Sequence, residues 1–207
     1  MFANQQQEVN MIQFKPFLMA AAGLALLTPT SHAQTTNLYP YYAAPPPTTK
    51  LEAIERGVGS IIIKASSPMG VVAANGGSVT ITCKEDQDLG TGLKEYGAGV
   101  GFKVGDQAEE TVLIDYDELD GLLDSIDRLN KLDWTVTSLS SFSAAYETKG
   151  GLRIAIFSSR RSGTIEIAVR ITRSDSNPVR LTRDQLSQLR NLLDQTRDKL
   201  QKLIKGQ

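Results

Sequence analysis

Residues 114–126 read IDYDELDGLLDSI, and 67 positions later residues 181–193 read LTRDQLSQLRNLL. Both stretches begin with an apolar residue and a good N-cap, Asp115 in the first and Thr182 in the second, and each has Glu or Gln three places after the cap. This is the capping-box pattern that starts a helix. Leucine and isoleucine then recur at helical spacing. The sequence therefore predicts two amphipathic helices that begin in the same way.

The same offset relates the strands before the two helices. In residues 100–104 and 167–171, apolar side chains alternate with small or polar ones, as in half-buried strands. We predict an α+β fold of two pseudo-repeats, about 58–133 and 134–205, each an antiparallel β-meander followed by an amphipathic helix packed on the sheet. A short capped helix at 50–56 precedes them. The predicted strands are 60–66, 69–73, 78–84 and 93–104, then 142–148, 151–157 and 164–172.

The N-terminal region is predicted to lie outside this single domain of residues 50–207. Residues 17–27 read FLMAAAGLALL and are followed by TPTSHA, the layout of a secretory signal peptide cleaved near Ala33. We assign 1–33 to this signal and expect export to the periplasm or the extracellular space. The apolar run is shorter than the roughly 20 residues of a membrane span. Residues 34–49, QTTNLYPYYAAPPPTT, are predicted to form a flexible Pro/Tyr-rich linker.

Absent residue types exclude several chemistries. The only histidine, His32, lies in the predicted signal peptide, which excludes Ser-His-Asp triads and histidine-ligated metals from the mature chain. Cys83 is the single cysteine, and alternation places it on the apolar face of a strand. The acidic run from Asp115 has Asp120 and Ile126 where a calcium loop needs glycine and glutamate. We therefore predict no enzymatic activity, no cofactor and no metal, and interpret the acidic run as a helix start.

Glycines 97, 99 and 101 share one face of a predicted strand. Their spacing is not the G-x-G-x-x-G of a dinucleotide fold, and the strand continues where a helix should begin. A face without side chains allows close approach of a backbone, a side chain or a ligand, and we interpret it as a packing surface.

A hairpin at RRSG, residues 160–163, leads to a candidate site. A four-residue loop aligns the apolar positions of the flanking strands, and it pairs Arg153 with Arg170 on the opposite face. A turn at Lys149 and Gly150 would then place Tyr146 beside Arg153. An alanine row would lie between an aromatic row and these arginines. The predicted ligand-binding residues are Tyr146, Arg153, Phe157, Arg160, Arg161 and Arg170.

Two arginines that face each other on a sheet are destabilising unless an anion or a carboxylate lies between them. An acidic side chain from the other repeat would satisfy them, and so would a bound anionic ligand stacked on Phe157 and Tyr146. The alanine row would also suit a closely packed helix.

The charges of the chain are divided between its halves. Residues 34–133 hold 16 acidic and 8 basic side chains, whereas residues 134–207 hold 6 acidic and 13 basic ones. Opposite fields of this kind favour docking of the two repeats, a protein partner or homo-oligomer, or an anionic polymer on the basic half. Arg183, Arg190 and Arg197 recur every seven residues, and we interpret this stripe mainly as a solvated helix face. The near-heptad leucines of the same helix could seat a partner helix.

In topology only, this order of repeated strands and helices resembles the tandem repeats of the Whirly and Pur-type single-stranded nucleic-acid binders. The resemblance implies base stacking and phosphate contact on the sheet. Our main expectation is an exported, non-enzymatic binding or structural protein. The alternatives are a polyanion or single-stranded nucleic-acid binding module, and a carboxylate-dependent hydrolase of cell-envelope polymers, which needs a pair of carboxylates across a cleft.

Overall fold

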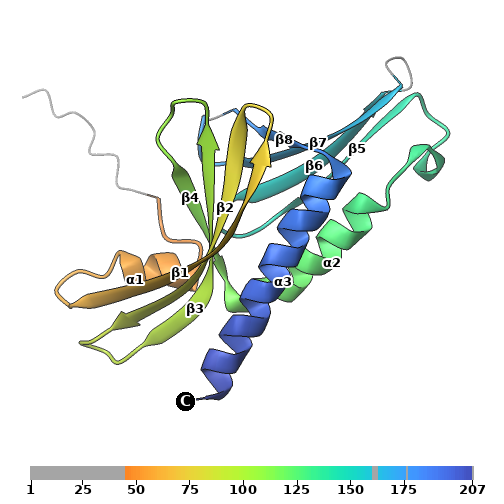
Figure 1. Cartoon of the computed structure of the whole chain (residues 1–207). Coiled ribbons are helices and arrows are strands. Elements are labelled where there is room, and N and C mark those ends of the chain that lie inside the picture. Colours follow the sequence, from red (N-terminus) through yellow and green to blue (C-terminus); the bar gives the residue numbers. More distant parts are fainter. Residues whose placement is uncertain (1–44, 160–162, 176, 207) are drawn as a thin grey trace, which may run out of the picture. The chain divides into compact units, whose positions relative to one another are not determined.

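The computed structural model describes residues 45–159, 163–175 and 177–206 (Figure 1). The predicted signal peptide and linker residues 34–44 lie outside these ranges. Within them, no helix is long and apolar enough to cross a membrane. In chain order the elements are α1 (Lys50–Glu55), β1 (Ile62–Ala74), β2 (Gly77–Asp88), β3 (Lys94–Val104), β4 (Glu110–Asp115), the 3-10 helix η1 (Tyr116–Glu118), α2 (Leu119–Asn130), η2 (Trp134–Val136), β5 (Ser141–Glu147), β6 (Leu152–Ser159), β7 (Thr164–Ile171), β8 (Val179–Leu181) and α3 (Arg183–Lys205).

Two four-stranded antiparallel sheets form the frame of the domain. Strands β1 to β4 pair in sequence order in sheet 1, and β5 to β8 do the same in sheet 2. One long helix follows each sheet in the chain, α2 after sheet 1 and α3 after sheet 2. The predicted α+β fold of antiparallel strands followed by a helix is confirmed.

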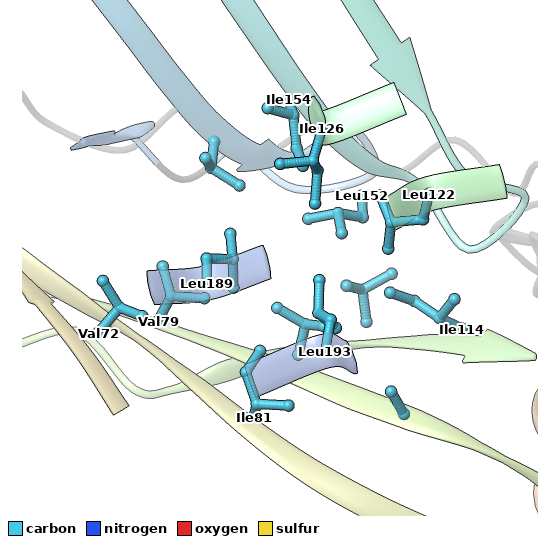
Figure 2. Packing of buried hydrophobic residues seen from close by; sticks show 14 of the residues in the cluster. Val72, Val79, Ile81, Ile114, Leu122, Ile126, Leu152, Ile154, Leu189 and Leu193 are labelled. Atoms are coloured by element: carbon cyan, nitrogen blue, oxygen red, sulfur yellow. The ribbon is translucent and has the colours of Figure 1, made fainter. Parts of the chain in front are cut away.

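The helices join the two sheets into one core. Helix α3 packs mainly on β1, β2 and β3 of the first sheet, whereas α2 packs on β5 and β6 of the second, and the two helices contact each other. Figure 2 shows Leu189 of α3 beside Val79, and Ile126 of α2 beside Ile154. Each helix therefore covers the sheet of the other repeat, so neither repeat buries its apolar face alone.

Ion pairs connect α2 with α3 along the predicted arginine stripe. Arg190 Nε lies 3.1 Å from Asp127, and Arg197 Nη1 lies 3.2 Å from Asp120. The guanidinium of Arg183 donates to the carbonyls of Asn130 and Leu132 at the C-terminus of α2. Our interpretation of the stripe as a solvated face was wrong. Its arginines face α2, whose Asp120 and Asp127 are also seven positions apart, so oppositely charged side chains of the two repeats pair where the helices meet.

Three strands differ from the prediction. The two strands expected at 60–66 and 69–73 form the single strand β1, with a register shift between Pro68 and Gly70. A bulge of this kind inserts an extra residue without ending the strand. Strands β4 and β8 were not predicted, because their apolar residues directly precede the helix caps and were counted as part of the helix starts.

The two predicted helix caps, Thr182 and Asp115, differ in the structure. The side chain of Thr182 forms the predicted capping box with Gln185 at the start of α3. Asp115 makes no side-chain cap for its own helix, which contradicts the prediction. Instead its carboxylate accepts from the backbone N–H groups of Lys50 (2.9 Å) and Leu51 (3.2 Å), and it is buried. Asp115 thus caps α1.

The glycine face of β3 lies beneath α1. Helix α1 contacts β2, β3 and β4, and its Leu51 is fully buried against Gly97. The predicted use of this face for close packing is confirmed at Gly97. On the opposite face of the sheet Cys83 is buried as predicted, and burial raises the pKa of its thiol.

Candidate functional site

The outer face of sheet 2 carries the predicted arginine pair. In the β6–β7 hairpin, Arg153 faces Arg170, Ala155 faces Ala168 and Phe157 faces Glu166, all as the sequence predicts. On β8, Arg180 lies opposite Ala168. This register places the three arginines on one face of adjacent strands, and neighbouring strands are about 4.8 Å apart.

These side chains surround a hollow of about 390 Å³, which we call the arginine trough. Its floor is made by small alanine side chains, and Phe157, which is 46% exposed, forms part of its wall. A floor of alanines lets a ligand approach the sheet, while the longer arginines reach up around it. The trough is lined by Arg153, Ala155, Phe157, Glu166, Ala168, Arg170, Pro178 and Arg180.

Two of the three arginines have acidic partners in the same sheet. Arg153 Nη1 lies 3.1 Å from Glu147 on β5, and Arg180 forms an ion pair with Glu166 on β7. A hydrogen bond from the Thr172 hydroxyl and the charge of Arg153 lower the pKa of Glu147. The compensating acid therefore comes from sheet 2 and not, as we expected, from the other repeat.

Arg170 is different from its neighbours. Its side chain makes neither a hydrogen bond nor an ion pair with any residue in the described ranges, and it is exposed. Its charge acts on Glu147 only through a longer-range attraction that lowers the pKa of that carboxyl. The arginine trough thus offers one guanidinium that is open to an anion and two that are shared with carboxylates.

Tyr146 does not belong to the trough, which corrects the prediction. The loop between β5 and β6 has three residues, because Thr148 N donates to Leu152 O (2.9 Å) and Gly151 adopts a positive φ of 94°. The predicted turn had two residues. The difference of one moves every β5 side chain to the other face. Tyr146 therefore lies opposite Ile154 on the core face, and Glu147 takes its place beside Arg153.

The same shift removes the predicted aromatic row. Phe142 and Ala144 also lie on the core face, and Ser143 is the residue opposite Phe157. Burial, followed by the charge of Glu118, raises the pKa of Tyr146. Of the remaining predicted site residues, Arg160 and Arg161 lie outside the described residues, so the structure leaves their part in the site as a prediction.

Two trough residues were missed by sequence reasoning. Arg180 was missed because β8 has only three residues, and its pattern of Val179, Arg180 and Leu181 is too short to stand out. Pro178 precedes it. One sequence signal could have indicated β8: it lies immediately before the Thr182 cap, at the place where β4 lies in the first repeat.

A larger hollow, of about 910 Å³, lies where loops of the two repeats meet. Both of its arginines already have partners: Arg173 Nη1 lies 3.2 Å from Glu52, and Arg56 donates to the Pro45 carbonyl. The paired arginines make this hollow a weaker anion site than the arginine trough.

A close carboxylate pair lies on the α1 side of sheet 1. Asp86 is fully buried, and its carboxylate oxygens have no hydrogen-bond partner in the described part of the chain. Burial raises the pKa of Asp86 to about 6, against the opposing attraction of Lys84, and the nearby Glu55 adds to the rise. Although burial alone would raise the pKa of Glu55, Lys84 and Lys64 hold it below its usual value. Because protein covers Asp86, this pair lacks the open cleft between carboxylates that glycoside hydrolysis needs.

Asp86→Asn is expected to stabilise the protein at about pH 8 by roughly 1–2 kcal/mol, with the gain vanishing at about pH 4. Folding raises the pKa of Asp86, so the folded state binds the proton more tightly than the unfolded state does. The favourable contribution of this group is present below its unfolded pKa and is lost as the pH rises through about 6. Urea unfolding of both proteins at the two pH values measures the difference.

The control for this experiment is Asp88→Asn. Hydrogen bonds from the Ser60 hydroxyl and the Gly90 backbone lower the pKa of Asp88, so its contribution is present above its unfolded pKa and is lost as the pH falls. Asp88→Asn should therefore destabilise the protein at about pH 8, opposite in sign to Asp86→Asn. A gain for Asp86→Asn that is equal at both pH values would contradict the assignment.

No protein-family model matches this chain, and no curated protein is similar to it in sequence. The function must therefore be argued from the fold and from the arginine trough.

Proposed function

We propose that this is an exported, non-enzymatic binding protein that holds an anionic polymer in the arginine trough. The observation that carries the proposal is the direct opposition of Arg153 and Arg170 on a sheet face open to solvent. Like charges at this position weaken a sheet. A bound anion between them would turn that cost into a favourable contact.

The chemistry of the trough suits phosphate or sulfate groups. A guanidinium can donate two parallel N–H hydrogen bonds to such an oxyanion and so binds it in bidentate geometry. Phe157 offers a ring on which a base can stack, and the resemblance in topology to the Whirly and Pur-type repeats supports single-stranded nucleic acid as one such polymer. Export favours a nucleic acid or another polyanion outside the cytoplasm.

Glu147 and Glu166 set the expected strength of binding. A polymer must compete with them for Arg153 and Arg180, whereas Arg170 is open. The interaction should therefore be moderate, and it should depend strongly on salt because it rests on neutralised phosphates or sulfates.

The double substitution Arg153→Ala/Arg170→Ala is expected to lower affinity for a heparin fragment or single-stranded DNA about 10-fold at low salt, and to reduce the salt-dependence slope by about two. The matched control is Arg128→Ala/Lys131→Ala, which removes two exposed positive charges at the C-terminal end of α2. Fluorescence anisotropy across a salt series measures both variants, with circular dichroism to verify folding.

A third variant separates the two kinds of polymer. Phe157→Ala should weaken binding of single-stranded DNA, which can stack, and leave binding of the heparin fragment unchanged. Equal affinities of the wild type and the double arginine variant would refute the proposed function.

A further inference from the structure

The core face of sheet 1 continues past the end of α3. Gln185 Nε2 donates to the carbonyl of Ala73 (2.8 Å), and Lys199 Nζ donates to Ser67 Oγ (2.6 Å), so α3 runs antiparallel along β1. The helix advances about 21 Å between these contacts and the strand about 20 Å, so the two keep pace. By the same rates α3, which ends at Lys205, stops about level with residue 64 or 65 of β1.

Beyond this level the sheet still presents apolar side chains. The β1–β2 register pairs Ile63 with Gln87 and so places Ile63 on the same face as buried Cys83. Just beyond the last ladder pair, the N–H of Leu89 donates to the carbonyl of Ile61 (3.0 Å), so these two residues face each other at the same end of the sheet. These side chains are 69% (Ile61), 45% (Ile63) and 50% (Leu89) exposed. The same face would be core if α3 were two turns longer.

The last turn of α3 also carries exposed apolar side chains. Leu200 is fully buried, but Leu203 is 42% exposed and Ile204 is 37% exposed. One chain therefore carries both an uncovered sheet end and an apolar helix end. Contiguous exposed apolar surface of this kind marks an interaction site.

We propose that two copies of this chain associate through these surfaces, with the C-terminal turn of α3 from each copy covering the sheet end of the other. Such a contact is made twice across a two-fold axis, as in isologous dimers. Glu85 on the sheet face at this end pairs with Lys94 (3.3 Å) and keeps 30% of its side chain exposed. Lys202 and Lys205 flank the helix end, so in the dimer they meet a carboxylate that is still open to solvent.

This inference is independent of the proposed function, because the arginine trough lies on the outer face of the other sheet. A dimer would present two troughs to one polymer and raise its apparent affinity.

Sedimentation velocity of the chain from Gln34, from about 1 to about 100 µM, tests the proposal. The wild type should approach the mass of a dimer, whereas Ile63→Glu and Leu203→Glu should each remain monomeric. Both positions are solvent-exposed, so the variants should keep their thermal stability. The control is Leu139→Glu, which places the same charge at a 70% exposed leucine elsewhere and should leave the dimer intact.

Mixing the two monomeric variants gives a sharper test. In a mixed dimer the intact sheet end of Leu203→Glu meets the intact helix end of Ile63→Glu, so one of the two contacts is restored, and the mixture should dimerise where neither variant does. A wild type that stays monomeric at about 100 µM would overturn the proposal, and binding of that monomer to phosphatidylcholine vesicles would assign the surface to lipid instead.

Discussion

Gly97→Ala is expected to lower the free energy of unfolding by about 3 kcal/mol, which is a large part of the stability of a domain this size. A Cβ at position 97 would collide with the carbonyl oxygen of Ile114 and would lie 2.6 Å from Cδ1 of Leu51. The carbonyl belongs to strand β4 and cannot move without breaking the sheet. The added methyl group must therefore displace α1 or separate β4 from β3.

The measurement is urea unfolding of the wild type and the variant. Gly101→Ala is the matched control, since it lies on the same face of the same strand. The three atoms nearest to a Cβ there all belong to the flexible side chain of Glu109, which can turn away. Gly101→Ala should be nearly neutral because alanine also restricts the unfolded chain. Similar losses for the two variants would show that the glycine face is not a packing surface specific to α1.

The pairing of β6 with β7 illustrates what sequence can predict. Both strands alternate strongly between apolar and polar residues, so a slip of one residue would turn the apolar side chains of one strand away from the core. The pairing of β5 with β6 could not be predicted in this way. Residues 141–147 read SFSAAYE, in which the two central alanines fit either face, and the turn residues KGG fit a loop of two or three residues.

The prediction of the candidate site was correct where the strand register was predicted correctly, and it failed where the register was not. Arg153, Phe157 and Arg170 follow from the β6–β7 hairpin, and the structure places all three in the arginine trough. Tyr146 was lost with the β5–β6 register, and Arg180 came from a strand too short to be seen. Local pattern thus gives the parts of the site that one hairpin controls, and no more.

Asp115 shows why the helix start at 114–126 was only partly predictable. The sequence fulfils a local capping rule, yet its carboxylate binds α1, which lies 65 positions earlier. A cap formed by a distant residue leaves no periodic or local signal. The arginine stripe of α3 is similar, because its partners on α2 become apparent only when the two helices lie together.

Asp115→Ala is expected to cost about 3 kcal/mol, because it leaves the buried N–H of Leu51 and the part-buried N–H of Lys50 without an acceptor. Asp115→Asn keeps one acceptor oxygen and should cost about half as much. Thr182→Ala, which removes a cap at the more exposed start of α3, should cost only about 1 kcal/mol. Urea unfolding gives the three values, and hydrogen exchange at the α1 amides shows whether the loss begins there.

Combining the two largest changes tests their shared cause. Gly97 faces Asp115 in the β3–β4 ladder, and both act on the first turn of α1. If each substitution detaches α1 from sheet 1, the second one removes few further contacts. Gly97→Ala/Asp115→Ala should then lower the free energy of unfolding by clearly less than the sum of the two single losses. Additive losses would mean that the two residues stabilise the sheet separately, with α1 still in place.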